Sequence, residues 1–391
     1  MNKLSSPSTP MLIERKSLGT KPKAHSGMPL TTRLDAHLGY QCNNNCLFCY
    51  FRERKNQRSP LPTEKAKRLL RLIKKLGIET LELTGGEVTL RSDIMELISF
   101  AKDDLGFKNI SIITNGSRFC DDAFAAEAIR RGVDDVLISV HGHSAELHDR
   151  LTDRKGSFDE VSRAITNVFN AGASCRTNTV VNKLNHRYVS DIAQTLHHLG
   201  LRKINFIFFS PLDDAAHLQE EIGVRYSDAA PHLERMIDRF RDKFETMSVK
   251  AVPFCFLDGY EHHITNFWQN LYDPCEWDFF NRVRVRRSRL IRDVSVFTGL
   301  LFFMDIRRML RIGRRKSYAE AIARFQSFRE CRKSSACRLC KYDKVCPGVW
   351  KAYARCFGLE EIRAVPGIKI EEIDFSVKDR FDKKLLSLRT E

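Results

Sequence analysis

The chain has 391 residues, of which 42% are hydrophobic and 29% are charged, the profile of a globular protein. No run approaches the roughly 20 apolar residues that a membrane-spanning helix needs, and the first ten residues lack the apolar block of a signal peptide. We therefore expect a cytoplasmic protein. A formal net charge of +16 favours acidic partners, but it does not distinguish among nucleic acid, anionic lipid and phosphorylated or carboxylated substrates. It is also compatible with a role in solubility alone.

Cysteine usage narrows the class of protein further. The chain contains 12 cysteines, and the reducing cytoplasm keeps thiols free. A disulfide framework is therefore disfavoured, and the cysteines point to metal binding or catalysis.

The order of predicted elements indicates an α/β fold. Residues 1–30 are rich in Ser, Pro, Lys and Thr and are interpreted as a loosely docked leader. Short β-rich runs then alternate with amphipathic helical stretches such as residues 63–77. The predicted strands are Arg33–Leu38, Glu79–Leu83, Asn109–Ile113, Asp135–Val140, Cys175–Val181 and Lys203–Phe209.

Six strands that are each followed by a helix predict a parallel sheet, in a partial (β/α)6 barrel of the TIM type over residues 31–225. Reactive groups in such barrels lie at the carboxyl ends of the strands. The alternation stops near residue 225. We therefore expect residues 226–391 to form a cysteine-rich α+β extension.

A compact group of cysteines follows the first predicted strand. Cys42, Cys46 and Cys49 place three thiolates within eight residues, and such thiolates hold iron–sulfur clusters. Three ligands to a cluster of four irons leave one iron open to a reactant, as in a catalytic zinc site. Structural zinc and unrelated free thiols are disfavoured, because no fourth ligand follows close in sequence.

This motif resembles the signature of the radical S-adenosylmethionine superfamily, which has three cysteines spaced by three and then two residues with an aromatic residue before the last. Phe48 stands at the aromatic position. The resemblance extends over residues 30–225 and implies roles for polar motifs on successive strands. The implied cosubstrate contacts are Phe48, Gly85, Gly86, Glu87, Thr114, Asn115, Ser139 and Asn178, with Arg176 as a companion of Asn178.

The resemblance assigns these contacts as follows. Glu87, in a GGE-type motif, faces the amino group of the methionyl part of S-adenosylmethionine, and the two glycines before it allow a close backbone approach. Thr114 and Asn115 form a turn beside the cluster. Ser139 contacts the ribose, and Asn178 holds the nucleoside or the carboxylate.

The implied chemistry is radical chemistry. A reduced [4Fe–4S] cluster, chelated by the amino and carboxylate groups of S-adenosylmethionine, passes one electron to the sulfonium. The products are methionine and a 5′-deoxyadenosyl radical that removes hydrogen from the substrate. The protein orients the cosubstrate against the substrate and excludes water.

Three histidines follow the fourth predicted strand. We expect His141 to contact substrate or cosubstrate, and His143 and His148 to serve the local loop or helix structure. Cys120 and Cys175 are expected to be ordinary buried thiols.

A second group of cysteines lies in the tail. The pair Cys337 and Cys340, followed by Cys346, resembles the SPASM extension or its shorter twitch form, which bind auxiliary [4Fe–4S] clusters. Trp350 stands where full SPASM has another cysteine, so the resemblance does not extend to a second auxiliary cluster. The resemblance thus implies one auxiliary cluster.

The fourth ligand of that cluster stays open at this stage. Cys255 is the preferred residue, and Cys275, Cys331 and Cys356 remain alternatives. Structural zinc also remains an alternative, since sites of four cysteines share this spacing.

Between the two cysteine regions lies an arginine-rich segment, residues 282–316, with an apolar centre. Three interpretations compete: helices packing an apolar face inward, a docking face for an acidic substrate or partner, and contact with a membrane surface.

Substrate identity does not follow from these motifs. A peptide or protein is favoured, because SPASM-like relatives often modify ribosomally made peptides, and a small metabolite such as a sugar, lipid or cofactor precursor is second. Nucleic acid ranks below both, and a mere electron carrier is disfavoured by the cosubstrate motifs. The expected electron donor is a protein such as flavodoxin or ferredoxin.

Overall fold

The computed structural model describes residues 30–52, 55, 60–210, 217–266, 269–271, 276 and 314–370. The expected leader therefore lies outside the described residues except for Leu30. Cys275 and all but the last residues of the arginine-rich segment 282–316 also lie outside them.

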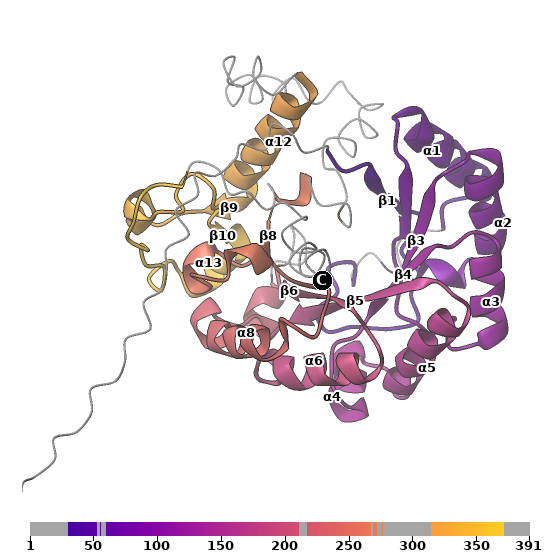
Figure 1. The fold of residues 1–391 in the computed structure, drawn as a ribbon, viewed down its shortest axis with the longest axis horizontal. Helices are drawn as coiled ribbons and strands as arrows, with labels where there is room; N and C mark the ends of the chain where they lie inside the picture. The colour runs from indigo at the N-terminus through magenta and orange to yellow at the C-terminus, as the bar shows by residue number, and fades with distance from the viewer. Residues whose placement is uncertain are drawn as a thin grey trace, which may run out of the picture.

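The centre of the fold is one curled parallel sheet, as the sequence predicted (Figure 1). Its eight strands are hydrogen-bonded in sequence order, and each pairs with the next in parallel. The strands are β1 (Arg33–His37), β2 (Thr80–Thr84), β3 (Asn109–Thr114), β4 (Asp135–Ser139), β5 (Ser174–Val181), β6 (Lys203–Phe208), β7 (Thr246–Lys250) and β8 (Ile264–Thr265).

The first six strands match the predicted ones to within a few residues, and the α/β partial barrel is confirmed. The sheet continues through β7 and β8, beyond the six strands that the sequence predicted. The domain boundary near residue 225 stays a prediction.

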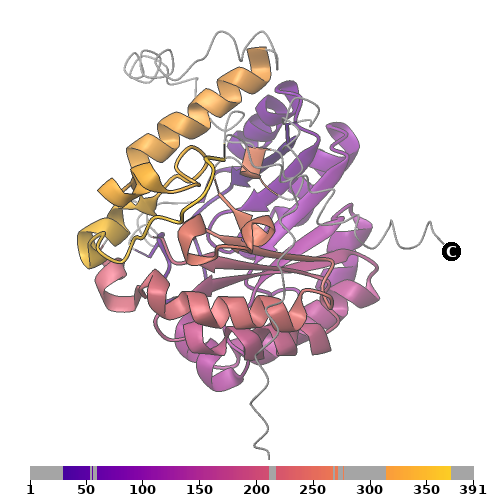
Figure 2. The same cartoon turned by 60° about the vertical axis from the view of Figure 1, so that its left-hand side comes forward.

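Helices cover the outer side of this sheet, where Figures 1 and 2 show them following its curve. They are α1 (Thr63–Lys75), α2 (Ile94–Ser99), α3 (Asp122–Arg130), α4 (Ala145–Thr152), α5 (Ser157–Asn170), α6 (Val189–His198) and α8 (Tyr226–Phe240). The short helix α7 (Leu218–Ile222) packs instead in an apolar cluster with Phe48.

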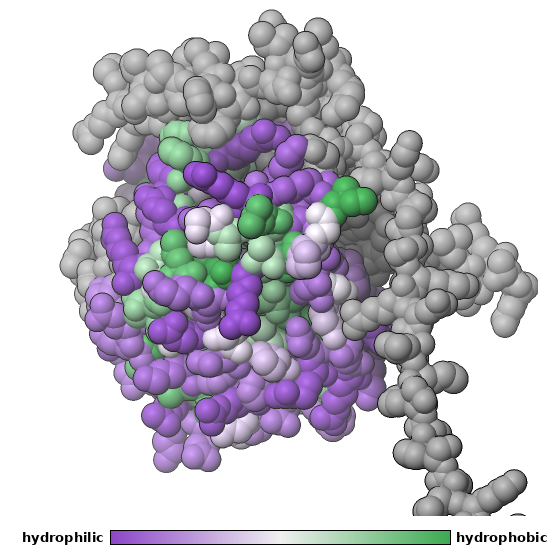
Figure 3. Space-filling model, turned by 90° about the vertical axis from the view of Figure 1, so that its left-hand side faces the viewer, coloured by the Kyte–Doolittle hydropathy of each residue, from purple (hydrophilic) through white to green (hydrophobic). Residues whose placement is uncertain are grey.

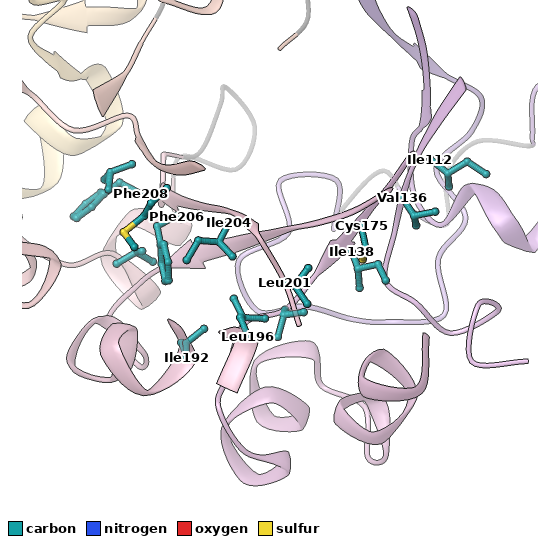
Figure 4. Close-up of a cluster of buried hydrophobic side chains, with 14 of the residues drawn as sticks. Ile112, Val136, Ile138, Cys175, Ile192, Leu196, Leu201, Ile204, Phe206 and Phe208 are labelled. Carbon is teal, nitrogen blue, oxygen red and sulfur yellow. The ribbon is translucent and has the colours of Figure 1, made fainter. Parts of the chain in front are cut away.

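Alternation along the strands decides which side chains meet the helices. Successive side chains of a strand point to opposite faces, so every second residue faces outward. Val136 and Ile138 of β4 and Ile204 of β6 are fully buried on the outer face, in the apolar layer that Figure 4 shows. This layer fixes the register of the sheet, because a slip by one residue would expose it.

The inner face carries a buried ion network instead. Arg33 on β1 and Arg176 on β5 both donate to Glu82 on β2, with Arg33 Nη1 lying 3.0 Å from Oε1. Arg176 Nε also lies 2.7 Å from Asp135 Oδ2, and Ser111 Oγ bridges the two carboxylates. Burial alone raises the pKa of Glu82, but Arg176 and Arg33 outweigh it and lower that pKa to about 2. Polar side chains from five adjacent strands thus form one connected network on the inner face of the sheet.

The C-terminal segment packs beside the last strands and α8. It comprises α12 (Arg314–Glu330), a hairpin of β9 (Cys331–Arg332) and β10 (Val349–Trp350), and α13 (Lys351–Phe357). The ring of Tyr353 stacks on that of Tyr226 at 4.2 Å, and its hydroxyl accepts from the Tyr226 backbone N–H at 2.9 Å. Buried Tyr342 donates to Asp258 at 2.5 Å.

The outer face of this segment is mostly hydrophilic, with apolar side chains scattered among polar ones (Figure 3). Phe328, Leu339 and Ile368 are its largest exposed apolar side chains. Among the described helices, none combines the length and the apolar character that crossing a membrane requires.

We expect Glu82→Ala to destabilise the protein by about 3–5 kcal/mol, because it removes the carboxylate shared by two buried arginines. Chemical unfolding of the variant and the wild type under identical anaerobic conditions measures the difference. Glu64→Ala is the matched control, since the Glu64 side chain is 73% exposed and its loss should cost less than about 0.5 kcal/mol. A cost for Glu82→Ala as small as that of the control would contradict the prediction.

The same network predicts a pH dependence. A lowered pKa in the folded state stabilises the fold above the ordinary carboxyl pKa of 4.5, and this contribution is lost as the pH falls towards about 2. The difference in stability between wild type and Glu82→Ala should therefore shrink over that range.

Candidate cluster and cosubstrate site

One cavity of about 480 Å³ opens on the inner face of the sheet; we call it the barrel cavity. Its wall comes from the inner face and carboxyl ends of β1 to β8, from residues 40–52, and from residues 347, 348 and 350 of the C-terminal segment. The cavity brings together all the residues that the sequence assigned to the first cluster and the cosubstrate: Cys42, Cys46, Phe48, Cys49, Gly85, Gly86, Glu87, Thr114, Asn115, Ser139 and Asn178.

Residues 40–52 form the cysteine loop, which is held by the end of α4. The Asn45 N–H donates to Thr152 O at 2.9 Å, and the Leu47 N–H donates to Leu151 O at 3.0 Å. Within the loop, the Cys49 N–H donates to Cys46 O at 3.0 Å. These backbone bonds fix the loop at the carboxyl end of the sheet, where reactive groups of such barrels lie.

The three thiols of this loop are free, partly exposed and close to one another. Burial, together with the neighbouring Cys49 and Cys42, raises the pKa of Cys46 to about 12. Burial also raises the pKa of Cys42 and of Cys49. Each thiol makes ionisation of its neighbours less favourable, and a bound cationic centre would reverse this effect because it stabilises thiolates. The three thiols are therefore suited to such a centre.

The two glycines after β2 bring backbone segments together. A Cβ at Gly86 would lie 2.1 Å from Gln41 O, and one at Gly85 would lie 2.2 Å from Gly39 O. The Gly86 N–H donates to Gly39 O at 2.9 Å, and the Glu87 N–H donates to Gln41 O at 2.6 Å. The close backbone approach that the glycines allow is therefore an approach to the start of the cysteine loop.

The Glu87 carboxylate joins the ends of β2 and β3. Its Oε1 accepts from the Thr89 N–H and hydroxyl and from Thr114 Oγ1 at 2.8 Å. Among the described residues, its Oε2 accepts one hydrogen bond, from the Asn115 N–H at 2.6 Å. Burial raises the pKa of Glu87, although these donors act against it. One oxygen is thus fully engaged, and the other keeps capacity for a further donor.

Ser139 and Asn178 face each other across neighbouring strands. They form a register pair of β4 and β5 at the carboxyl end of the sheet, and both line the barrel cavity. Asn178 Oδ1 is buried and has no hydrogen-bond partner among the residues that the structure describes. Buried polar atoms are nearly always satisfied, so this oxygen fits a donor from a bound molecule.

Arg176 lines the floor of the cavity rather than standing free beside Asn178. Its guanidinium is held by Glu82 and Asp135 in the buried ion network. Its charge is therefore largely compensated by the protein itself.

Two of the three histidines are buried behind the cysteine loop. His141 lines the barrel cavity, and its ring meets that of Phe48 edge to face at 4.5 Å. His148, in α4, accepts from the His141 backbone N–H at 3.1 Å, which agrees with the expected structural role. Burial lowers the pKa of His141 well below its usual range and that of His148 to about 4. Both rings are therefore neutral at pH 7.

The tail cysteines gather around a second, small cavity. Cys255, Cys337, Cys340 and Cys346 all line it, although Cys255 lies more than eighty residues earlier in the chain. The Gly348 N–H donates to Cys346 Sγ and the Val365 N–H to Cys340 Sγ, both at 3.4 Å. Gly348 lines the barrel cavity as well, so the two cavities share a wall.

The remaining cysteines lie apart from this lining. Cys331 is buried near Cys346, and Cys356 is half-buried on α13. Cys175 is buried as predicted, but the prediction for Cys120 was wrong, because Cys120 is only half-buried and its Sγ donates to Ser117 O at 3.1 Å.

Neither group of thiols is a preformed single-ion site. Among the described residues, no three His, Cys, Asp or Glu side chains are arranged to hold one metal ion. The cysteines are candidate ligands because of their chemistry and their shared cavities.

The last part of the cavity wall, at β7 and β8, was not predicted from the sequence. Lys250, at the end of β7, pairs with Glu276, and both line the barrel cavity beside Thr265 of β8. A signal was present, because Thr246–Lys250 alternates polar and apolar residues as a strand does.

Residues 37–197 match the family model of the Radical SAM superfamily. This family uses a [4Fe–4S] cluster and S-adenosylmethionine. The match covers the strands and turns that surround the cysteine loop, so it agrees with the resemblance found in the motifs.

Two curated relatives are described as probable GTP 3′,8-cyclases. The one from Saccharolobus islandicus is 30% identical over 187 residues, which are 48% of this chain and 59% of the relative. The one from Sulfurisphaera tokodaii is 27% identical over 223 residues, which are 57% of this chain and 68% of the relative. The alignment with the first thus spans less than two thirds of that relative.

Among solved structures, native anSMEcpe with bound AdoMet has a similar fold. The TM-score is 0.52 at 15% identity, over 93% of this chain and 99% of that chain. At this identity the likeness concerns the fold alone.

We expect Gly86→Ala to disturb the cysteine loop, because its Cβ would lie 2.1 Å from Gln41 O and 2.5 Å from Tyr40 O. Overpacking of this kind costs about 1–3 kcal/mol, and iron bound after anaerobic reconstitution should fall with it. Gly39→Ala is the matched control, since the nearest atom to its Cβ is 3.8 Å away. Equal iron content and equal thermal stability in the two variants would contradict the expectation.

Proposed function

We propose that this chain, which carries a radical SAM domain over residues 37–197, is an enzyme that cleaves S-adenosylmethionine reductively and removes hydrogen from a substrate. The observation that supports the proposal most is the barrel cavity, which unites three free thiols with the predicted cosubstrate contacts. The preferred substrate is a peptide or protein.

Cys42, Cys46 and Cys49 are the proposed ligands of the first [4Fe–4S] cluster. Three cysteine ligands leave one iron for the amino and carboxylate groups of S-adenosylmethionine. When bound, this cluster supplies the electron that generates the 5′-deoxyadenosyl radical. Asn115 Nδ2, at 3.8 Å from Cys42 Sγ, places a donor beside one ligand and so favours its thiolate form.

The chain's own residues would orient the cosubstrate. Glu87 Oε2 accepts from the ammonium group, since this oxygen keeps capacity beside the Asn115 N–H. Ser139 and Asn178 contact the nucleoside from adjacent strands, and the unpartnered Asn178 Oδ1 gains a donor. Phe48 supplies apolar surface next to the thiols.

The tail cysteines would hold an auxiliary cluster. Cys337, Cys340, Cys346 and Cys255 are its proposed ligands, because they share one cavity. Backbone N–H groups that point at Cys340 and Cys346 stabilise bound thiolates and tune such a cluster.

The charge of the barrel cavity bears on the substrate. The described lining contains four basic and four acidic side chains, in contrast to the formal charge of +16 on the whole chain. Its deepest cations, Arg176 and Lys250, are paired with carboxylates. A cavity without surplus positive charge favours an uncharged or zwitterionic group, such as a peptide segment, over a nucleoside triphosphate.

A small metabolite is the second candidate substrate, since the curated relatives are described as probable GTP 3′,8-cyclases. Stimulation of 5′-deoxyadenosine formation by added GTP would favour it. The proposed electron donor is a small redox protein such as flavodoxin or ferredoxin. Contact of residues 282–316 with a membrane surface stays a prediction.

We expect replacement of Cys42, Cys46 and Cys49 together by Ala to remove about four of about eight irons per chain. Formation of 5′-deoxyadenosine should be abolished, because S-adenosylmethionine then lacks its iron. Iron analysis and product chromatography measure both effects, and Cys120→Ala, outside both cavities, should retain both. Wild-type iron content and turnover in the triple variant would overturn the proposed function.

We expect Cys255→Ala to lower the iron content from about eight to about four per chain, because it removes one ligand of the tail cluster. Cys356→Ala is the matched control and should retain about eight irons. The reverse pattern would show that Cys356 is the fourth ligand. Wild-type protein with about four irons and one zinc would identify the tail as a structural zinc site.

A further inference from the structure

His141 lies where the predicted nucleoside contacts meet. It follows Ser139 by two residues at the end of β4, and its ring nitrogen Nδ1 is bonded to the backbone of β5 two residues after Asn178. Its ring also packs edge to face against Phe48 of the cysteine loop. Three structural elements therefore hold this ring at the wall of the barrel cavity.

Hydrogen bonds fix the tautomer of His141. The Val180 N–H donates to His141 Nδ1 at 3.2 Å, so Nδ1 acts as the acceptor. A neutral imidazole carries its single proton on the other nitrogen, which makes Nε2 the donor. The backbone of His141 is also bound on both sides, by His148 Nδ1 at 3.1 Å and by Asn185 Nδ2 at 3.0 Å. Ring and backbone are thus preorganised.

The Nε2 donor of His141 has no acceptor among the described residues, and the residue lines the cavity. His148 Nε2, in contrast, is fully enclosed, and it too has no partner in the described part of the chain. A fixed N–H group at a cavity wall binds an acceptor at little entropic cost, since its orientation is already set.

We propose that His141 donates a hydrogen bond from Nε2 to an acceptor on the adenosyl part of S-adenosylmethionine. The inference rests on the proposed function, and it adds a binding residue to the predicted contacts. The nucleoside is the favoured recipient because Ser139, Asn178 and Phe48 surround the same position. The competing explanation is that His141 only ties β4 to β5 through Nδ1.

Two variants separate these explanations, because they replace different halves of the ring. In His141→Asn, the side-chain amide lies where Nδ1 was, so the bond from Val180 can persist while the cavity donor is lost. In His141→Gln, the longer amide reaches the position of Nε2 and restores a donor there, while the Nδ1 acceptor is lost. A binding role and a structural role therefore predict opposite orders of the two variants.

The experiment measures binding of two probes to reconstituted protein by calorimetry. 5′-Deoxyadenosine carries the nucleoside, and methionine carries the groups that meet iron. We expect His141→Asn to weaken binding of 5′-deoxyadenosine by about 3- to 10-fold and His141→Gln to weaken it less. Methionine binding and iron content should stay at the wild-type level in both variants. His198→Ala, an exposed histidine of α6, serves as the control for unrelated histidine loss.

The outcomes separate this inference from the proposed function. Should His141→Gln lose more nucleoside affinity than His141→Asn, or should methionine binding fall equally, His141 is a structural residue and the inference is overturned. If wild-type protein binds neither probe, the proposed function itself fails. If wild type binds both probes and neither variant differs from it, only the role of His141 is refuted.

Discussion

Close backbone packing between the end of β2 and the start of the cysteine loop is the constraint on which the site depends. Gly85 and Gly86 lie against Gly39 and Gln41 so tightly that a side chain at either glycine would strike a carbonyl oxygen. Glu87 links this packing to β3, because its carboxylate accepts hydrogen bonds from Thr114 Oγ1 and from the Asn115 N–H. The loop is fixed from the other side by the end of α4. Three thiols that are only partly buried thereby gain defined positions before any metal arrives.

The inner face of the sheet sets the electrostatics around these thiols. Its buried ion network satisfies the arginines with carboxylates of neighbouring strands, so the barrel floor is polar without being basic. Among the described residues that line the barrel cavity, acidic and basic side chains are equal in number. The net charge of the chain therefore affects its association with other macromolecules. The paired charges of the cavity affect which substrate groups can bind inside it.

The C-terminal segment connects the two cysteine groups. Tyr353 and Tyr342 anchor it to α8 and to the residues after β7, and this packing brings Cys255 next to the tail cysteines. Trp350 and Gly348 of the same segment line the barrel cavity. Trp350, which stands in place of a further cysteine, is thus part of the wall around the proposed reaction site.

The first six strands, the three thiols after the first of them and the polar motifs at later strand ends could be predicted from the sequence, because these features are local patterns of spacing and alternation. The sequence motifs also indicated Cys337, Cys340 and Cys346 as ligands of the tail cluster. They offered Cys255 as one of four candidates for its fourth ligand. Only the packed fold brings Cys255 to the cavity of the tail cysteines, the two glycines against the cysteine loop and Arg176 to Glu82. The role of Cys255 as the fourth ligand stays a prediction. Tertiary structure also decided the position of Lys250 in the cavity wall. Each of these joins residues far apart in the chain, and such contacts follow from how strands and helices pack rather than from any local pattern.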